Sequence, residues 1–512
     1  MKRTLLLTSG LLLTSFASAE TVLHMTVDPD GTNGHISKHL YGHFAEHLGR
    51  GIYDGFWRQD ANGDYIIRDD VVAAMKELGV PNLRWPGGCF ADYYFWQHGV
   101  GPKAERPTVV NNLWGGVTED NSVGTHEFME LCAELETEPI VVGNVGSGTV
   151  EDMANWWQYL NHPGPSPMAK KRAENGREEP WNVRFFGVGN ESWGCGGHMR
   201  PEKYADDYRQ YSTFLFDYGT VKPFRIATGP AGSDYTWTDV VMELAGDRID
   251  GLDLHHYTLD GSWTTKKGEA VHFDEGGWFR LMERAMEMDE LLTNHAAIMD
   301  EHDPEKRVWL IVGEWGTWHE QEEGSTPGFL YQQNTLRDAL TASITLDIFH
   351  QHLDRVKMAN IAQTINVLQA MILTDGEQML RTPTYHTFDL YKPHREATAL
   401  PFELDRGEYE REGASLPAVS ATVSKDAAGR LHISLTNIDP HAARTVEIDL
   451  GDIRGQVVQD ARILTADEMN AHNTFASPDA LVPVEFDGVK TAAGKLVVSL
   501  PAKSLVTFGL GS

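Results

Sequence analysis

Two glutamates in this sequence stand in settings that suit the cleavage of a bond between sugars. Glu191 lies in Gly189-Asn190-Glu191-Ser192-Trp193-Gly194, and Glu314 lies in Gly313-Glu314-Trp315-Gly316. Glycosidic cleavage needs one carboxyl group to protonate the leaving oxygen and a second to meet the positive charge that develops at the anomeric carbon. Tryptophan next to each glutamate can stack on sugar rings and can raise a carboxyl pKa by excluding water. The pair therefore predicts glycoside hydrolysis by two carboxyl groups.

The elements around these glutamates alternate between short apolar runs and helical periods from about residue 40 to 390. This alternation indicates a parallel sheet built from βα units, and eight runs predict an α/β fold with a (β/α)8 TIM barrel. Two of the credible helices between the runs are residues 204–218 and 279–300. The eight runs are Tyr41 to Phe44, Val80 to Trp85, Pro139 to Gly143, Val183 to Val188, Phe224 to Ala227, Ile249 to Leu254, Val308 to Val312 and Ala359 to Ala362.

By this count Glu191 and Glu314 follow strands four and seven. Catalytic groups of such barrels lie at the C-terminal ends of the strands, so the two carboxyl groups should face each other across the barrel mouth. A separation of about 5 to 5.5 Å would let the second glutamate attack directly with retention of configuration, whereas about 6.5 to 9.5 Å would admit a water molecule.

Beyond about residue 395 the helical period gives way to strong strand alternation, as in Leu431 to Thr436 and Thr445 to Leu450. This pattern is typical of an antiparallel β-sandwich, here a C-terminal, jelly-roll-like domain. We expect the catalytic barrel to span residues 41–392 and the sandwich residues 393–512. Residues 20–40 have strand character and should join the sandwich.

The N-terminus is typical of an export signal. Met1-Lys2-Arg3 precedes an apolar stretch from Thr4 to Phe16 and an Ala17-Ser18-Ala19 cleavage pattern. These features predict a signal peptide over residues 1–19 and a mature protein, beginning at Glu20, that is secreted to the periplasm or the medium. No later stretch is long and apolar enough to span a membrane.

Charge and cysteine content exclude several other classes of protein. The formal net charge is −31, which disfavours nucleic acids and anionic membrane surfaces as partners. The three cysteines, Cys89, Cys132 and Cys195, form no C-x-x-C pair and allow at most one disulfide. Neither a metal nor an organic cofactor is required by the proposed chemistry.

Taken together, the motifs resemble those of glycoside hydrolase family 51, the α-L-arabinofuranosidases, over nearly the whole mature chain. A Gly-Asn-Glu-x-Trp-Gly motif alone is shared by many barrel hydrolases, but the ordered set is far more specific. The matching segments are residues 41–49 (Tyr-Gly-His-Phe-Ala-Glu-His-Leu-Gly), 83–92 (Leu-Arg-Trp-Pro-Gly-Gly-Cys-Phe-Ala-Asp), 187–194 (Gly-Val-Gly-Asn-Glu-Ser-Trp-Gly), 312–315 (Val-Gly-Glu-Trp) and 472–475 (His-Asn-Thr-Phe).

The resemblance implies a retaining, exo-acting α-L-arabinofuranosidase with Glu191 as general acid/base and Glu314 as nucleophile. Its substrates would be arabinoxylan, arabinan or oligosaccharides derived from them, and the family suggests a homo-oligomer, often a hexamer.

The family also implies a set of substrate-binding residues around the two glutamates. Asn190 would bond the sugar 2-hydroxyl, Glu46 would accept bonds from other hydroxyls as an ionised carboxylate, and Tyr257 would orient Glu314. Cys89 would contact the sugar as a thiol, a weak hydrogen-bonding group. Gln363, Trp318 and Trp114 would complete the pocket.

Three alternatives remain open at this stage. Residues 43–47 fit H-x-x-E-H, an inverted zinc-hydrolase pattern, although this motif needs a helix and no helical period surrounds it. A non-catalytic carbohydrate-binding protein could also carry a tryptophan-rich barrel mouth. An endoglucanase or a β-xylosidase could use the same barrel, because the loops set the subsite shape.

Overall fold

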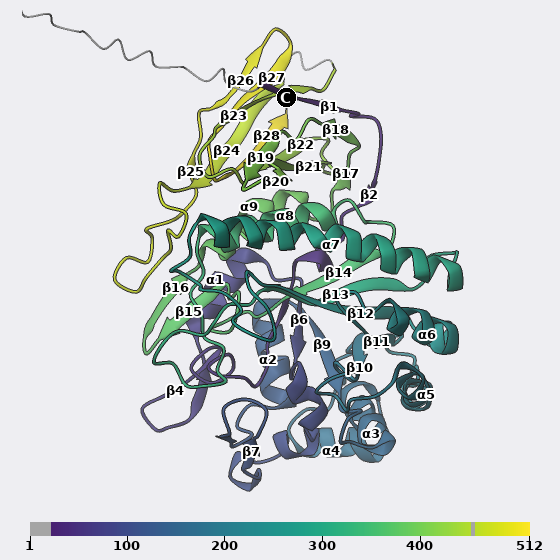
Figure 1. Cartoon of the computed structure of the whole chain (residues 1–512). Coiled ribbons are helices and arrows are strands. Elements are labelled where there is room, and N and C mark those ends of the chain that lie inside the picture. The colour runs from purple at the N-terminus through teal and green to yellow at the C-terminus, as the bar shows by residue number, and fades with distance from the viewer. Residues whose placement is uncertain (1–21, 452–455, 512) are drawn as a thin grey trace, which may run out of the picture.

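The structure is a computed structural model that describes residues 22–451 and 456–511. The predicted signal peptide, residues 1–19, and the predicted mature start, Glu20, lie outside the described residues. Figure 1 shows the barrel at one end of the molecule and the sandwich at the other, with α7, α8 and α9 between them. No helix in the described ranges is long and apolar enough to cross a membrane.

Eight parallel strands close into a barrel, in the order β3-β6-β9-β10-β11-β12-β13-β14. Most side chains along these strands are buried, as expected for a parallel sheet covered on both faces. All eight predicted runs fall on these strands, so the predicted TIM barrel is confirmed. The strands are β3 (Gly42–Phe44), β6 (Asn82–Trp85), β9 (Glu138–Gly143), β10 (Phe185–Val188), β11 (Phe224–Ala231), β12 (Gly251–Thr258), β13 (Trp309–Thr317) and β14 (Val356–Ile361).

Most of the helices that cover the barrel begin at side-chain caps or prolines that suit a helix N-terminus. Thr149 and Thr335 form capping boxes at α3 and α8, and Pro201 occupies the first turn of α5. The α-helices are α1 (Asp69–Leu78), α2 (Thr125–Leu135), α3 (Val150–Asn161), α4 (Pro167–Glu174), α5 (Pro201–Ser212), α6 (Tyr235–Ala245), α7 (Glu275–His302), α8 (Leu336–Phe349) and α9 (Pro383–Tyr391).

One predicted helix is shorter than its sequence period suggests. The expected helix over residues 204–218 ends as α5 at Ser212. The carbonyl of Leu215 instead accepts a bond from the Arg225 side chain, and that of Phe216 accepts one from the Trp157 indole. These tertiary hydrogen bonds replace the helical ones and fix the connection to β11.

Two sheets make up the sandwich: a five-stranded sheet, β18-β1-β23-β27-β26, and a seven-stranded sheet, β2-β17-β21-β22-β28-β24-β25. The pairing is antiparallel except between β1 and β23, which run parallel. The N-terminal strand β1 therefore lies beside strands from the other end of the chain. The strands are β1 (Val22–Val27), β2 (Gly34–His35), β17 (Thr398–Ala399), β18 (Phe402–Leu404), β21 (Val419–Lys425), β22 (Leu431–Asn437), β23 (Arg444–Asp449), β24 (Val457–Thr465), β25 (Val484–Glu485), β26 (Val489–Ala492), β27 (Lys495–Leu500) and β28 (Ser504–Gly511).

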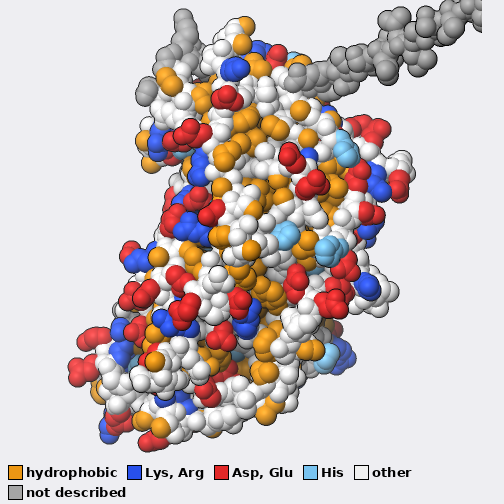
Figure 2. All heavy atoms as spheres, turned by 90° about the vertical axis from the view of Figure 1, so that its left-hand side faces the viewer, with side chains coloured by type: hydrophobic (Ala, Val, Ile, Leu, Met, Phe, Trp, Pro, Cys, Tyr) orange, Lys and Arg blue, Asp and Glu red, His pale blue; other side chains and the backbone are white. Residues whose placement is uncertain are grey.

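Four two-stranded hairpins complete the fold, and each is antiparallel. They are β4 with β5 (Trp57–Gln59, Tyr65–Ile67), β7 with β8 (Val109–Asn111, Val117–Glu119), β15 with β16 (Ile372–Asp375, Gln378–Arg381) and β19 with β20 (Glu408–Arg411, Ala414–Pro417). On the face that Figure 2 shows, acidic side chains are spread from one end of the molecule to the other and basic ones lie among them, without a continuous basic surface.

The barrel and the sandwich meet through a buried carboxyl group. Asp347 of α8 has no exposed side-chain surface, and it accepts hydrogen bonds from Ser420 (2.5 Å) and Thr422 (2.6 Å) of β21 and from Tyr391 of α9 (2.7 Å). Burial raises the pKa of Asp347 to about 6, although the three hydroxyl donors oppose the shift. Asp347 therefore connects helices α8 and α9 to strand β21 of the sandwich.

We expect Asp347→Ala to lower the free energy of unfolding by about 3 kcal/mol, because three buried hydroxyl groups would lose their common acceptor. Thermal or urea denaturation would measure the loss. Asp206→Ala, at an exposed position of α5, is the matched control and should change stability by less than about 0.5 kcal/mol. Equal stability of the two variants would show that Asp347 does not hold the layers together.

Candidate active site

The C-terminal ends of the barrel strands bring both predicted glutamates to one place. Glu191 follows β10, three residues after the strand ends, whereas Glu314 lies within β13 itself. The sequence predicted that Glu314 follows its strand, but β13 continues to Thr317. The pairing of β13 with each of its neighbours, β12 and β14, shifts in register near Glu314. Such irregularities turn a side chain toward a site without ending the strand.

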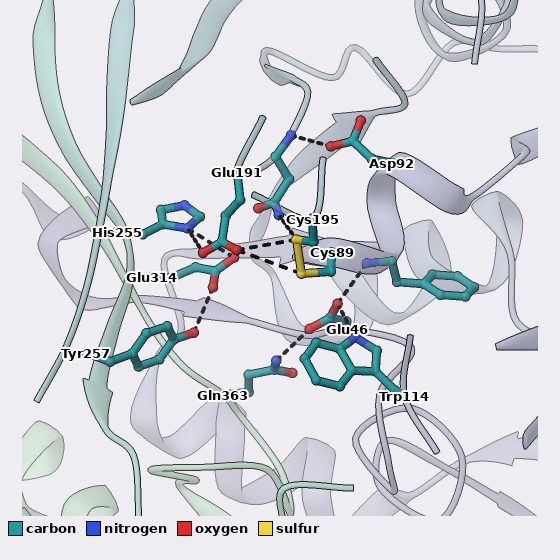
Figure 3. Close-up of a disulfide and its surroundings, with 12 residues drawn as sticks. Glu46, Cys89, Asp92, Trp114, Glu191, Cys195, His255, Tyr257, Glu314 and Gln363 are labelled. Carbon is teal, nitrogen blue, oxygen red and sulfur yellow. Dashed lines mark hydrogen bonds and ion pairs between the residues drawn. A yellow bond between two sulfur atoms is a disulfide. The ribbon is translucent and has the colours of Figure 1, made fainter. Parts of the chain in front are cut away.

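The two carboxyl groups are close together. An oxygen of Glu191 and an oxygen of Glu314 lie within 4.8 Å of each other, and His255 of β12 lies beside both. His255 Nδ1 is 3.0 Å from Oε1 of Glu191 and 3.5 Å from Oε1 of Glu314. Figure 3 shows the two glutamates side by side with the imidazole next to them.

Glu314 is held by two hydrogen-bond donors. Arg84 Nη1 donates to Oε1 at 2.9 Å, and the Tyr257 hydroxyl donates to Oε2 at 2.7 Å. Arg84 is buried on β6, and its other terminal nitrogen donates to Asn190 Oδ1 at 2.6 Å. Burial opposes the charge on Arg84, but Glu314 and Asp253 outweigh it and raise the pKa of the guanidinium. One arginine thus orients both Glu314 and Asn190.

Glu191 has a different environment. Burial raises the pKa of its carboxyl group and nearby Glu314 adds to the effect, while the hydrogen bond with His255 opposes it. Burial also opposes protonation of His255, but Glu314, Asp253 and Glu191 outweigh it and raise the pKa of the imidazole to about 10. These shifts favour a cationic imidazole and a protonated Glu191 carboxyl group.

A second buried carboxyl group, Glu46, marks the other side of the pocket. It accepts bonds from Phe90 N (3.0 Å), Trp114 Nε1 (2.9 Å) and Gln363 Nε2 (2.9 Å). Burial and Glu314 raise the pKa of Glu46 to about 7 against these donors, so the expectation of a fully ionised carboxylate does not hold near neutral pH. A Cβ at Gly88 would lie 2.8 Å from Glu46 Oε2, so glycine is needed for this approach.

The Cys89 prediction needs correction, because Cys89 forms a disulfide with Cys195. The expected thiol contact with a sugar is absent in this form, since a disulfide sulfur carries no proton to donate. Cys195 Sγ lies 3.4 Å from Glu191 Oε2, so the bridge packs against the carboxyl group. It links the loop after β6 to the loop after β10, where Glu191 has a positive φ of 40°. A non-glycine residue in this conformation depends on its surroundings to hold it.

The remaining predicted residues lie around these groups. The Asn190 backbone N–H donates to buried Asp92 at 2.8 Å. Trp318 packs edge-on against Tyr257 with ring centroids 4.9 Å apart. The structure thus brings together the nine residues singled out from the sequence, from Glu46, Trp114 and Gln363 on one side to Trp318 on the other. Figure 3 shows the central part of this arrangement.

Sequence reasoning assigned no role to Arg84, His255 or Asp253. Each lies at a barrel strand, and Asp253 Oδ2 is 3.3 Å from His255 Nε2 and 3.9 Å from Arg84 Nη2. The signal that could have found them is a charged side chain within an otherwise apolar strand, as in Leu83-Arg84-Trp85 and Leu252-Asp253-Leu254-His255. A charge buried there needs partners, and the partners define the site.

Two residue groups invite comparison with a metal centre. The H-x-x-E-H motif runs from β3 into a loop, so its histidines do not share a helix face; His47 is bonded to Glu119 at 2.8 Å and to the Trp85 indole at 3.1 Å. Glu191, His255 and Glu314 are close enough to hold an ion. The contacts of His255 with both carboxyl groups also suit proton transfer within this cluster.

Comparisons with known proteins agree with the geometry. Two family models match the chain: an α-L-arabinofuranosidase 1 domain over residues 74–272 and an α-L-arabinofuranosidase C-terminal domain over residues 313–504. A similar solved structure, the GH51 arabinofuranosidase of Xanthomonas axonopodis pv. citri, is 47% identical with a TM-score of 0.93 and covers 96% of this chain and 100% of that one.

Two sequence relatives carry more specific names. The "Intracellular exo-alpha-L-arabinofuranosidase" of Bacteroides ovatus is 49% identical over 515 residues, covering 100% of both chains. The "Intracellular exo-alpha-(1->5)-L-arabinofuranosidase" of Acetivibrio thermocellus is 31% identical, covering 68% of this chain and 71% of its own. Both names describe intracellular enzymes, which contradicts the predicted export. The prediction of a signal peptide and of a secreted protein is therefore wrong on this comparison, and the apolar leader-like pattern alone was insufficient.

The disulfide gives a stability prediction, because it joins loops 106 residues apart in sequence. We expect a strong thiol reductant to lower the free energy of unfolding by about 3 kcal/mol, since the unfolded chain regains loop entropy. Urea denaturation with and without reductant would measure this change.

Paired variants separate the bridge from other effects of the reductant. The double variant Cys89→Ala/Cys195→Ala should show no reductant effect, whereas Cys132→Ala, which removes the buried free cysteine, should keep it. An equal reductant effect in the double variant and the wild type would mean that the bridge is not its source.

Proposed function

The chain belongs to the α-L-arabinofuranosidases of glycoside hydrolase family 51, and from this premise we propose that it releases terminal arabinofuranosyl groups by a retaining, double-displacement reaction. Glu314 is the nucleophile and Glu191 the general acid/base. The substrates are side chains of arabinoxylan, terminal residues of arabinan, or oligosaccharides derived from either. Oligomeric state stays a prediction from the family resemblance.

The observation that carries the proposal is the short distance between the two carboxyl groups. Oxygens of Glu191 and Glu314 lie within 4.8 Å. Retaining glycosidases place their carboxyl groups about 5 to 5.5 Å apart, and the wider spacing of about 6.5 to 9.5 Å belongs to enzymes that fit a water molecule between them. The short spacing supports direct attack on the sugar.

The environments of the two glutamates support the division of roles. Glu314 accepts bonds from Arg84 and Tyr257, which fix the direction of its carboxyl group. Glu191 has a raised pKa and lines an open cleft, so it can hold a proton and deliver it to a leaving group.

In the first step Glu191 protonates the glycosidic oxygen while Glu314 attacks the anomeric carbon. The bond from that carbon to the leaving oxygen breaks, and an ester to Glu314 forms. In the second step Glu191, now ionised, takes a proton from water, and the resulting oxygen attacks the same carbon. Arabinose leaves, Glu314 is again a carboxylate, and Glu191 has regained its proton.

The pocket around Glu46 supports binding of a terminal sugar. Trp114 and Gln363 both donate to Glu46, and none of the three lines the open cleft, so they would hold the terminal ring apart from the leaving group. Asn190, oriented by Arg84, would bond the 2-hydroxyl, and Trp318 would border the ring near Tyr257. Hydrogen bonds to hydroxyls give such a pocket its selectivity, because an unmatched buried polar group is costly.

Active-site variants test the roles directly on p-nitrophenyl α-L-arabinofuranoside. We expect Glu314→Ala to lower kcat by at least about 10⁴-fold, because no nucleophile remains. Glu191→Ala should lose about 10² to 10⁴-fold in kcat/KM on substrates with poor leaving groups. Azide should rescue Glu191→Ala and give an arabinosyl azide of retained configuration. An inverted product, or activity that survives in Glu314→Ala, would contradict the mechanism.

The raised pKa of Glu191 predicts the alkaline side of the pH profile. The general acid must carry its proton, so kcat/KM for an unactivated substrate should fall as the pH rises through the pKa of Glu191, and that pKa should lie above the ordinary glutamate value. A pH series of kcat/KM would locate this limb. In Glu191→Ala with an activated aryl substrate, the same limb should be absent; its persistence would assign the titration to another group.

A further inference from the structure

A cleft of about 740 Å³ opens next to Glu191, on the side away from Glu46. Glu191, His255 and Tyr257 line it next to the catalytic groups, and residues of α7 line it as well. Glu46, Trp114 and Gln363 do not line it. Since Glu191 gives its proton to the leaving oxygen, a cleft that begins at Glu191 and excludes the Glu46 pocket lies on the leaving-group side.

Aromatic residues form one wall of this cleft. Trp193, Trp263 and Trp318 all line it, and Trp263 is 54% exposed. Trp263 packs edge-on against Trp318 with centroids 5.1 Å apart, and Lys267 Nζ lies 5.8 Å and 5.9 Å from the two ring centroids. A large indole held in place at an open surface is suited to stacking on a sugar ring.

Acidic residues of α7 also line the cleft. Glu287 and Glu290 both line it, three residues apart on one helix face. Arg284 pairs with Glu287 at 2.6 Å, but both side chains are more than 40% exposed, so the pair offsets little of the local field. No lysine or arginine is among the described residues that line the cleft.

His256 adds no positive charge to this cleft. It lines the cleft from β12, and burial lowers its pKa to about 4, so the imidazole is neutral at working pH. His255, which also lines the cleft, favours a positive charge beside Glu191, whereas Glu287 and Glu290 make the α7 part of the cleft acidic.

We propose that this cleft binds the uncharged backbone of the leaving saccharide, and that Glu287 and Glu290 select against backbones that carry a uronic acid near the bond being cut. The inference rests on the proposed function, because it extends the leaving-group side of that same site. A volume of 740 Å³ lies in the range of sites that bury a drug-sized ligand, roughly two or three sugar rings. Carboxylates can accept bonds from sugar hydroxyls, but they repel a second carboxylate.

The test compares two substrates that differ only in charge. Both are xylotetraoses with a single arabinofuranosyl branch; the neutral one carries a glucosyl group on the neighbouring xylose, and the acidic one carries a glucuronosyl group in its place. At low ionic strength we expect kcat/KM for the neutral substrate to exceed that for the acidic one by about tenfold, and added salt should reduce the ratio because exposed charges are screened. A ratio of one at low salt would overturn the proposal.

Charge variants assign the selectivity to α7. In Glu287→Gln/Glu290→Gln the ratio should fall to within about twofold of one. Glu301→Gln, an exposed acid on the same helix about 16 Å further along, is the matched control and should keep the wild-type ratio. A double variant that keeps the full tenfold ratio would overturn the role of these two glutamates, even if both substrates are cleaved well.

Trp263 tests backbone binding separately from charge. We expect Trp263→Ala to lower kcat/KM about tenfold on the neutral branched xylotetraose and far less on p-nitrophenyl α-L-arabinofuranoside, whose leaving group is one small ring. An equal loss on both substrates would overturn the stacking role.

The aryl substrate also separates failure of this inference from failure of the proposed function. Loss of aryl hydrolysis in the wild type, or its survival in Glu314→Ala, would defeat the proposed function. Normal aryl hydrolysis combined with no charge selectivity would defeat the further inference alone.

Discussion

The site depends on a buried balance of charge between Arg84 and His255, on one hand, and Glu314 and Asp253 on the other. Arg84 contacts both carboxyl groups, and His255 lies 3.3 Å from Asp253 and 3.5 Å from Glu314. A buried charge without a partner is costly, so removal of one member would leave the others uncompensated. The barrel positions every member, because Arg84, Asp253, His255 and Glu314 all lie on strands. Rigid strands keep these distances short where loops would not.

Much of the fold can be predicted from the sequence, because the strands of the barrel are recognisable as short apolar runs. A strand that is buried on both faces needs apolar residues along its whole length, and this pattern can be seen within a single segment of the sequence. The same property explains how Glu191 and Glu314 could be paired from strand counting alone, although they lie far apart in the sequence. Glu314 was misplaced only with respect to its strand end, since the register shifts around it come from pairing with β12 and β14. No single segment encodes such a pairing.

Other features depend on contacts between distant segments and were missed for that reason. The Cys89–Cys195 disulfide requires the loops after β6 and β10 to meet, and three scattered cysteines leave every pairing open. The raised pKa of Glu46 comes from burial among side chains of other loops. The prediction of export failed for a different reason. It was based only on a charged and apolar N-terminal pattern, whereas two relatives of this chain are named as intracellular enzymes.

The charge balance also explains how the proposed reaction can proceed in a buried site. With Glu191 protonated, two cations face two carboxylates. When Glu191 gives up its proton and Glu314 forms an ester, one negative charge appears and another disappears within 4.8 Å of it. His255, 3.0 Å from Glu191 and 3.5 Å from Glu314, contacts the charge in both states. The total charge stays constant, so fixed groups stabilise each state without reorganising, which is the economical arrangement for catalysis away from water. A neutral residue in place of His255 would remove the cation beside ionised Glu191 and would penalise the very state in which Glu191 must act as a base.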